Sequence, residues 1–125
     1  MKISIWGVRG SIPSSGPDTN HYGGNTSCIS IYHNGCLLIL DGGSGLQRLV
    51  MPSLIQTNRI DILLTHLHLD HIQGLGFFKP LFDPSMDIHI WGPASSDRGL
   101  HSRLSRYLSP PLFPVNIRDL PCRLT

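Results

Sequence analysis

The 125-residue sequence predicts one α/β layered domain. Short apolar stretches typical of β-strands alternate with stretches typical of helices, and this alternation favours a layered fold. Hydrophobic residues make up 40% of the chain and charged residues 14%, a globular balance that supplies a modest core. The sequence contains no internal repeat and no low-complexity segment.

The first 40 residues are predicted to form three strands, at 2–6, 28–32 and 36–40. The second and third of these strands form a β-hairpin through the turn at Asn34-Gly35. Residues 7–27 are rich in Gly, Pro, Ser and Asn and are predicted to form a long loop. Loops of this length inside a compact domain are often functional.

The rest of the chain is predicted to alternate helices and strands. Ser44 is expected to cap a helix that runs to about Gln56 and that Pro52 bends or ends early. Residues 72–78 are expected to form a short helix, and residues 95–108 an amphipathic helix. Three further strands are expected at 60–65, 87–91 and 116–124. The first of them is a run rich in Ile and Leu, so we place it centrally in the sheet.

The cysteines and the N-terminus bear on where the protein works. In the hairpin register His33 faces Cys36 and Cys28 lies opposite Asp41, so a Cys28–Cys36 disulfide is not expected. The sequence has no C-x-x-C motif. The N-terminus has one lysine and no long apolar run, which predicts neither a signal peptide nor a membrane anchor. A reducing, cytoplasmic location is the expectation.

The charge pattern gives little indication of a partner. The formal net charge is +2 with neutral histidines, and the ten Lys and Arg residues are spread along the chain. Because no basic stripe with interleaved aromatic residues is present, stable nucleic-acid binding is not expected. A mild attraction for anionic substrates follows from the charge.

The clearest functional signal is the stretch LLTHLHLDHIQG at residues 63–74. It places three of the seven histidines, with one aspartate, within six residues directly after a predicted buried strand. In an extended segment every second side chain points the same way, so His66 and His68 share a side while Leu67 and Leu69 point into the core. Two imidazoles on one side are able to bind one zinc ion.

Asp70 and His71 follow where the strand gives way to a turn. From there they aim at the same region from another angle and fit a second metal, since two-metal hydrolytic sites hold their ions about 3.5–4 Å apart. Mixed nitrogen and oxygen ligands suit zinc, with manganese or iron as alternatives. Unrelated polar residues at a strand end are the alternative explanation, but four potential ligands in six residues favour a metal site.

The sequence THLHLDH at residues 65–71 resembles the H-x-H-x-D-H signature of the metallo-β-lactamase fold hydrolases. Three further stretches resemble the branch that holds phosphoribosyl cyclic phosphodiesterases and ribonuclease Z-like proteins: GVRGSIPSSGPDTNHYGGNTSC, ILDGGSGL and HLDHIQGLGFFKPLF. The resemblance runs from residue 3 to about residue 120. It implies an αββα sandwich of which residues 1–125 supply the N-terminal part.

The resemblance also implies roles for single residues. His66 and His68 would be ligands of a first zinc ion, and Asp70 and His71 ligands of a second, with Mn²⁺ or Fe²⁺ as alternatives. Asp41 resembles the acidic residue beneath the site that orients a ligand or a water. Asp70 is in addition the candidate catalytic residue, because it would help orient the attacking hydroxide.

Family members are longer and take a third histidine, a bridging aspartate and a last histidine from further along their chains. His89 and His101 do not match these roles, since they lie in a predicted strand and a predicted helix. The first hypothesis is a metal-dependent hydrolase that cleaves a small phosphodiester or nucleotide-like substrate with metal-bound hydroxide. The second is a truncated, inactive fragment; a homodimer that completes the site, and lactam or thioester hydrolysis on the same fold, stay open.

Three residues of the long loop are candidates for substrate contact. The stretch GGNTS, with Asn25 and Thr26, would place backbone N–H groups near a phosphate. Arg9 in the same loop would meet an anionic substrate. A glycine turn before a strand and a surface arginine are the corresponding structural alternatives.

Overall fold

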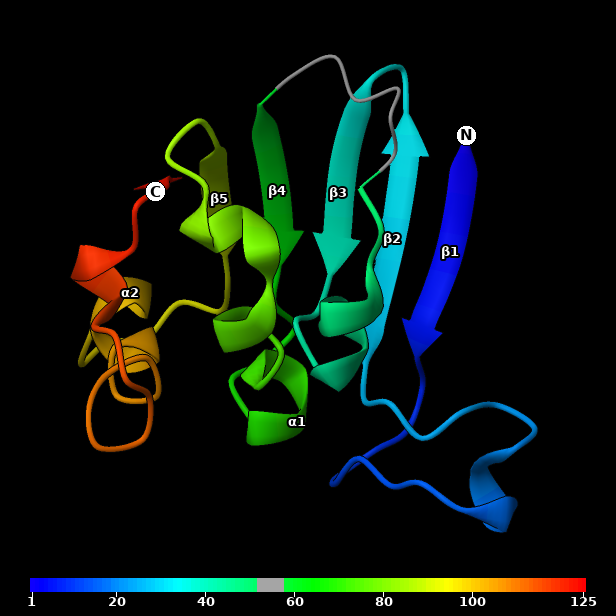
Figure 1. The fold of residues 1–125 in the computed structure, drawn as a ribbon. Helices are drawn as coiled ribbons and strands as arrows, with labels where there is room; N and C mark the ends of the chain where they lie inside the picture. The colour runs from blue at the N-terminus through cyan, green and yellow to red at the C-terminus, as the bar shows by residue number, and fades with distance from the viewer. Residues whose placement is uncertain (52–57) are drawn as a thin grey trace.

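The computed structural model of the chain describes residues 1–51 and 58–125. Within these residues the strands form a six-stranded sheet in the order β1-β2-β3-β4-β5-β6 (Figure 1). The strands are β1 Lys2–Gly7, β2 Cys28–His33, β3 Cys36–Leu40, β4 Arg59–Leu63, β5 Asp87–Trp91 and β6 Arg123–Leu124. The pairs β1–β2 and β2–β3 are antiparallel, whereas β3, β4, β5 and β6 run parallel to one another.

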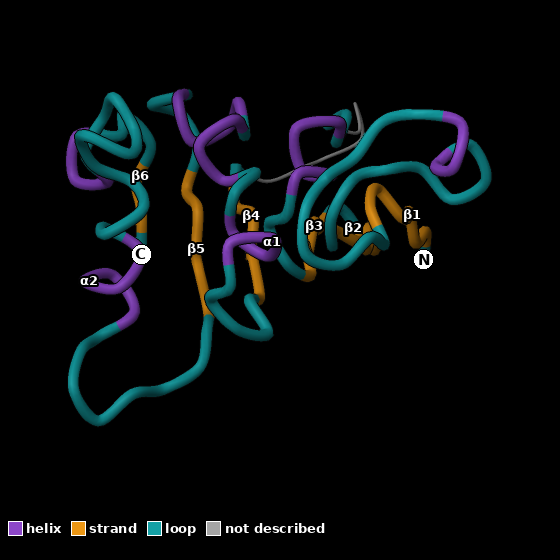
Figure 2. The backbone as a smooth tube through the Cα atoms, turned by 90° about the horizontal axis from the view of Figure 1, so that it is seen from below, coloured by secondary structure: helices purple, strands orange, loops and turns teal. Residues whose placement is uncertain are grey.

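The helical segments are all short. The α-helices are α1 Leu69–Ile72 and α2 Leu100–Leu104, and the 3₁₀ helices are η1 Pro17–Thr19, η2 Ser44–Arg48, η3 Leu75–Phe77, η4 Lys79–Phe82 and η5 Ile117–Asp119. Figures 1 and 2 show that the segments after β3 and β4 lie on one side of the sheet. None of the helices in the described ranges has the length and apolarity that crossing a membrane requires.

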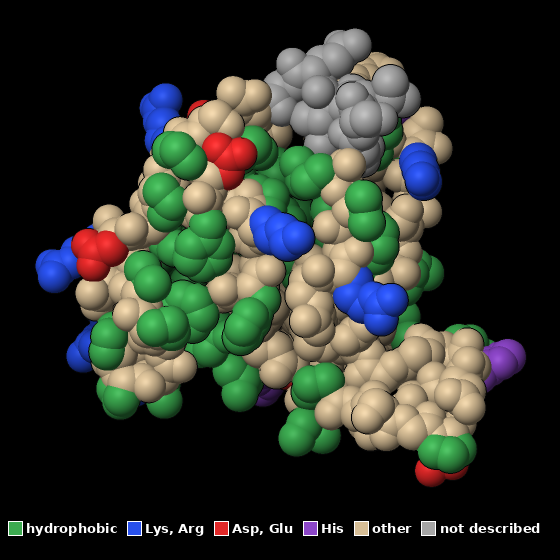
Figure 3. All heavy atoms as spheres, viewed as in Figure 1, with side chains coloured by type: hydrophobic (Ala, Val, Ile, Leu, Met, Phe, Trp, Pro, Cys, Tyr) green, Lys and Arg blue, Asp and Glu red, His purple; other side chains and the backbone are tan. Residues whose placement is uncertain are grey.

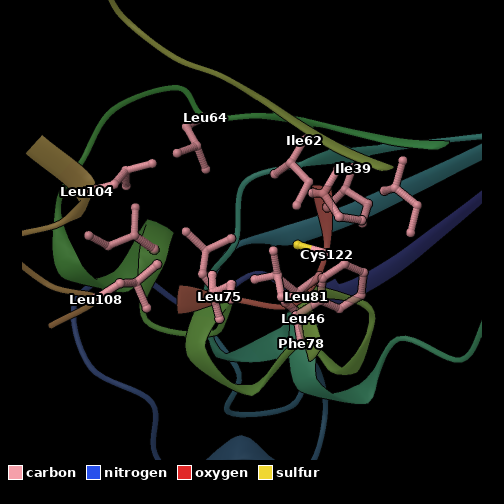
Figure 4. Close-up of a cluster of buried hydrophobic side chains, with 14 of the residues drawn as sticks. Ile39, Leu46, Ile62, Leu64, Leu75, Phe78, Leu81, Leu104, Leu108 and Cys122 are labelled. Atoms are coloured by element: carbon pink, nitrogen blue, oxygen red, sulfur yellow. The ribbon is translucent and has the colours of Figure 1, made fainter. Parts of the chain in front are cut away.

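The hydrophobic core lies between the sheet and this helical layer. Side chains alternate along a strand, so every second residue of the central strands faces the helices. These inward residues include Ile39, Ile60, Ile62 and Ile88, all fully buried. Figure 4 shows side chains of the helical layer, among them Leu46, Leu75 and Leu81, meeting the sheet.

The opposite side of the sheet is also apolar. Strand pairing brings Ile5 beside Ile29, Ile29 beside Leu40, and Leu40 beside Leu63. Ile5 is 65% exposed and Leu63 39% exposed, so this side faces solvent rather than a second layer. One helical layer on one β layer is half of the αββα arrangement that the sequence predicts.

The strand predictions at 2–6, 28–32, 36–40, 60–65 and 87–91 are confirmed to within two residues at each end. The strand expected at 116–124 is confirmed only at its end, because the segment holds η5 and the two-residue β6. The helix expected over 95–108 is α2 alone, five residues long. The helix expected over 72–78 is split, since α1 ends at Ile72 and η3 begins at Leu75.

The helix expected after Ser44 is also shorter than predicted. Ser44 is the first residue of η2 rather than its cap, and the cap position is Gly43. The segment ends at Arg48 because Leu49 turns to an extended conformation, with φ −63° and ψ 118°. The predicted continuation through Pro52 to Gln56 lies outside the described residues.

The three cysteines are free and differ in exposure. Cys28 is fully buried, and burial, together with the nearby Asp41 carboxylate, raises the pKa of its thiol to about 12. Burial also raises the pKa of Cys122. Because the thiolate is the reactive form, we expect iodoacetamide at about pH 8 to alkylate the exposed Cys36 and to leave the other two intact in the native protein. Peptide mass spectrometry measures this; alkylation of Cys28 at the rate of Cys36 would contradict the described packing, and labelling in urea serves as the control.

Candidate metal centre

The predicted metal ligands lie where the chain leaves β4. This strand runs parallel to β3 and β5, and its carboxyl end opens at the edge of the sheet where ligands bind in α/β folds. The chain then continues to His68, which has an extended backbone with ψ 151° and caps α1. Asp70 and His71 stand in the single turn of α1.

The structure brings all four side chains together. The ring centroids of His66 and His68 are 4.5 Å apart, and those of His66 and His71 are 4.1 Å apart. The Nε2 atom of His71 lies 3.5 Å from Oδ2 of Asp70. Three imidazoles and one carboxylate therefore share one small region at the end of β4.

Two details of this segment differ from the sequence prediction. Leu69 was expected to point into the core, but it is 58% exposed. The reason is that α1 begins at Leu69, so the alternation of an extended strand no longer applies there. For the same reason Asp70 and His71 sit on a helix rather than a turn, whereas Leu67 packs partly against the core.

Asp41 lies beneath this group and is only 4% exposed. Its Oδ2 is 2.8 Å from Nδ1 of His71 and accepts a hydrogen bond from the Ser27 hydroxyl at 3.2 Å. Its Oδ1 accepts a hydrogen bond from the Thr65 backbone N–H at 2.8 Å. The backbone of Asp41 has φ 59°, a conformation that Asp tolerates better than most residues. The carboxylate is thus held at a fixed point under the histidines.

Thr65 is a residue of the site that the sequence prediction missed. Its Oγ1 lies 3.0 and 3.1 Å from the two carboxylate oxygens of Asp41 and 3.0 Å from Nδ1 of His66. Its place directly before the first histidine is the one sequence signal that points to it. Threonine at a strand end is common, so that signal is weak by itself.

The long loop returns to the site through Ser11. The Ser11 backbone N–H donates a hydrogen bond of 2.9 Å to Oδ2 of Asp70. This hydrogen bond, followed by the nearby His71 and His66, lowers the pKa of Asp70. The expectation that the loop is functional did not identify this contact, because it spans 59 positions in the sequence.

The candidate substrate residues take part in holding the loop. Arg9 pairs with Thr26 in a parallel bridge, and its Nε donates to the Ile12 carbonyl at 2.8 Å. Thr26 is fully buried, and its Oγ1 accepts from the backbone N–H of Ser44 at 2.8 Å. The side-chain oxygen of Asn25 accepts from the Ser44 hydroxyl at 3.1 Å. A substrate contact by Arg9, Asn25 or Thr26 stays a prediction.

The donor set fits divalent zinc in kind. Over residues 1–51 and 58–125, no three His, Cys, Asp or Glu side chains are arranged to hold one ion. The four ligands are nevertheless the imidazole and carboxylate types that zinc takes. Asp41 occupies Nδ1 of His71 and Thr65 occupies Nδ1 of His66, the kind of outer contact that metal-ligating histidines make. That the chain offers two ligands to each of two ions stays a prediction.

Comparison with known proteins yields relatives named ribonuclease Z. The chain is 32% identical over 99 residues to the ribonuclease Z of Myxococcus xanthus, covering 77% of this chain and 32% of that protein. It is 27% identical over 123 residues to the ribonuclease Z of Haloarcula marismortui, covering 96% of this chain and 37% of that protein. The chain thus spans about a third of the length of these two curated relatives.

Solved structures share the fold. The short form of human tRNase Z superposes with a TM-score of 0.64 at 22% identity, covering 99% of this chain and 44% of that one. A diphosphatase from the PhnP family superposes with a TM-score of 0.54 at 14% identity, covering 98% of this chain and 48% of that one. These likenesses confirm the fold class that the sequence predicts.

The family itself is shown by a match to a family model. The model described as the metallo-beta-lactamase superfamily matches residues 21–118, a range that includes Asp41 and the four predicted ligands. With the ribonuclease Z relatives, this match confirms the resemblance drawn from THLHLDH and the N-terminal loop. The chain belongs to the metallo-beta-lactamase superfamily.

Proposed function

We propose that this chain carries one part of the active site of a metal-dependent phosphodiester hydrolase that uses zinc. The observation that carries the proposal is the cluster of His66, His68, Asp70 and His71 at the end of β4, with Asp41 fixed beneath it. Membership of the superfamily and relatives named ribonuclease Z support it.

The four candidate ligands and Asp41 have different proposed roles. His66 and His68 would hold one zinc ion, and Asp70 and His71 the other. When bound, the ions supply Lewis-acid chemistry to the phosphate and make water a better nucleophile. Asp70 remains a carboxylate at neutral pH, since the Ser11 N–H lowers its pKa, so it is ready to ligate or to orient the attacking group. Asp41 keeps the His71 ring in place.

RNA is the substrate that we favour over the small phosphodiester expected from the sequence. The reason is the name ribonuclease Z that the curated relatives carry. On the face shown in Figure 3, Lys and Arg side chains stand singly rather than in a stripe. This pattern favours transient contact with a strand over stable binding.

Two further expectations belong to the proposal. A reducing, cytoplasmic location is supported by three free cysteines. A homodimer that combines the ligands of two chains stays a prediction.

A His68→Ala variant tests the proposed function. Because it removes a metal ligand, we expect zinc content to fall and hydrolysis of a labelled single-stranded RNA and of bis(p-nitrophenyl) phosphate to drop about 100-fold or more. Elemental analysis measures the zinc content, gels measure RNA cleavage, and the absorbance of released p-nitrophenolate measures hydrolysis of the second substrate. His101→Ala, on an exposed residue of α2, is the matched control and should change neither.

Full activity of His68→Ala would overturn the proposal. Zinc binding by the wild-type chain without hydrolysis of either phosphodiester would favour the inactive-fragment hypothesis instead. Cleavage of a lactam or a thioester, assayed in parallel, would favour the third hypothesis.

A further inference from the structure

The hydrogen bonds beneath the site determine which nitrogen of His71 carries its proton. A carboxylate oxygen accepts and does not donate. Since Nδ1 of His71 lies 2.8 Å from Oδ2 of Asp41, that nitrogen carries the hydrogen. In the neutral ring Nε2 is then the unprotonated nitrogen. This Nε2 atom lies 3.5 Å from the Asp70 carboxylate, on the side where His71 and Asp70 would bind the same metal ion.

The same reasoning extends to His66 through Thr65. A threonine hydroxyl has one hydrogen, and the two Asp41 oxygens at 3.0 and 3.1 Å are acceptors that require it. The hydroxyl oxygen is left to accept from Nδ1 of His66 at 3.0 Å. The proton of His66 is thereby placed on Nδ1, and its Nε2 is free to bind a metal.

We propose that Thr65 is a positioning residue that relays the orienting effect of Asp41 to His66. One buried carboxylate then sets two neighbouring imidazoles, His71 directly and His66 through the hydroxyl. The ring centroids of His66 and His71 are 4.1 Å apart, so the unprotonated nitrogens of both rings lie in the same candidate metal centre. The consequence for metal binding rests on the proposed function; the consequence for the tautomer does not.

Thr65→Val isolates this relay, because valine keeps the shape of the side chain and the backbone N–H bond to Asp41 but removes the hydroxyl. Thr65 is solvent-exposed, so the variant is expected to fold. ¹⁵N NMR of the metal-free protein at about pH 8, above the ordinary pKa of imidazole, reports the tautomer of each ring. We expect wild-type His66 and His71 both to carry the proton on Nδ1. In Thr65→Val, we expect the tautomer of His66, but not that of His71, to shift toward a proton on Nε2. In Thr65→Ser, which keeps a hydroxyl, we expect the proton of His66 to be on Nδ1 again.

His71 is the comparison within the same protein, since Asp41 holds its Nδ1 directly at 2.8 Å in every variant, whereas the Thr65 hydroxyl lies farther from it, at 3.4 Å. Wild-type His66 with its proton on Nε2 would overturn the inference, and this result needs no variant. An unchanged His66 in Thr65→Val would also overturn it. Equal changes in His66 and His71 would do the same, because they would mean a general loss of structure.

Zinc affinity gives a second readout. Loss of an outer contact to a metal-ligating histidine typically weakens binding by about 10- to 100-fold. We expect a zinc titration with a competing chelator to give this loss for Thr65→Val and recovery for Thr65→Ser. If the wild-type chain binds no zinc while the tautomers are as expected, the proposed function fails and the positioning role stands. If zinc binds with equal affinity to all three proteins, the positioning role in metal binding fails.

Discussion

Replacing Asp41 with asparagine is expected to lower the free energy of unfolding by about 2–3 kcal/mol. Asparagine tolerates the positive φ of 59° at this position, so the backbone should not contribute. The change replaces one acceptor oxygen by an NH₂ group, which then faces either the Thr65 backbone N–H at the Oδ1 position or Nδ1 of His71 at the Oδ2 position. Buried donors without acceptors are the costly case in hydrogen bonding. Urea denaturation followed by circular dichroism measures the loss.

The matched control is Asp119→Asn, because its carboxylate is 57% exposed and pairs only at the surface. We expect it to change stability by about 0.5 kcal/mol or less. An Asp41→Asn protein as stable as wild type would mean that the carboxylate does not anchor the site. Zinc affinity should fall in parallel with stability, since His71 loses its partner.

Replacing Gly43 with alanine is expected to cost about 3 kcal/mol or more in stability. A Cβ at this position would stand 2.3 Å from the Asp70 carbonyl oxygen and 2.7 Å from that of Ser27. Both are backbone atoms, and the Gly43 N–H donates to the second of them at 2.9 Å. Relief of the clash must therefore displace either the start of β2 or the helix that carries Asp70. Thermal and urea denaturation measure the cost.

Gly10→Ala is the control for this substitution. Apart from its chain neighbours, no atom lies within 4 Å of a Cβ built on Gly10, which stands in the long loop after β1. Its stability should stay within about 0.5 kcal/mol of wild type. If Gly43→Ala were equally neutral, the close packing of the Asp41–Gly45 turn against α1 would be wrong.

The sequence was sufficient to predict the first five strands and the gathering of His66, His68, Asp70 and His71 after β4, for physical reasons. Runs such as Ile60 to Leu64 leave few alternatives to a buried strand, and the Asn34-Gly35 turn fixes the hairpin register, with His33 opposite Cys36 as predicted. The four candidate ligands lie within six consecutive residues, so they stay close to one another in any tertiary structure. The turn formed by DGGSG at residues 41–45 is joined to α1, because the Gly42 N–H donates to the His71 carbonyl at 2.7 Å.

Most of the features that sequence reasoning missed are non-local. The contact between Ser11 and Asp70 joins a loop to a helix, and no spacing rule connects them. Helix lengths were overestimated because periodicity continues past the point where packing ends the helix, as in the segment after Leu104. Leu69 was assigned to the core because the strand was extended too far. In each case tertiary contacts override the local pattern.

The order of strands in the sheet equals their order in the chain, from β1 to β6. During synthesis a chain emerges N-terminus first at about 5–20 residues per second, whereas a hairpin closes in about 1–10 μs. When a strand is synthesised, the strand with which it pairs has therefore already been formed. The meander of β1, β2 and β3 precedes the rest, so on the ribosome Asp41 is available before Thr65, His66 and His71 have been translated. The acceptor Asp41 and its donor Ser27 are therefore synthesised before Thr65 and His71, which bond to the same carboxylate.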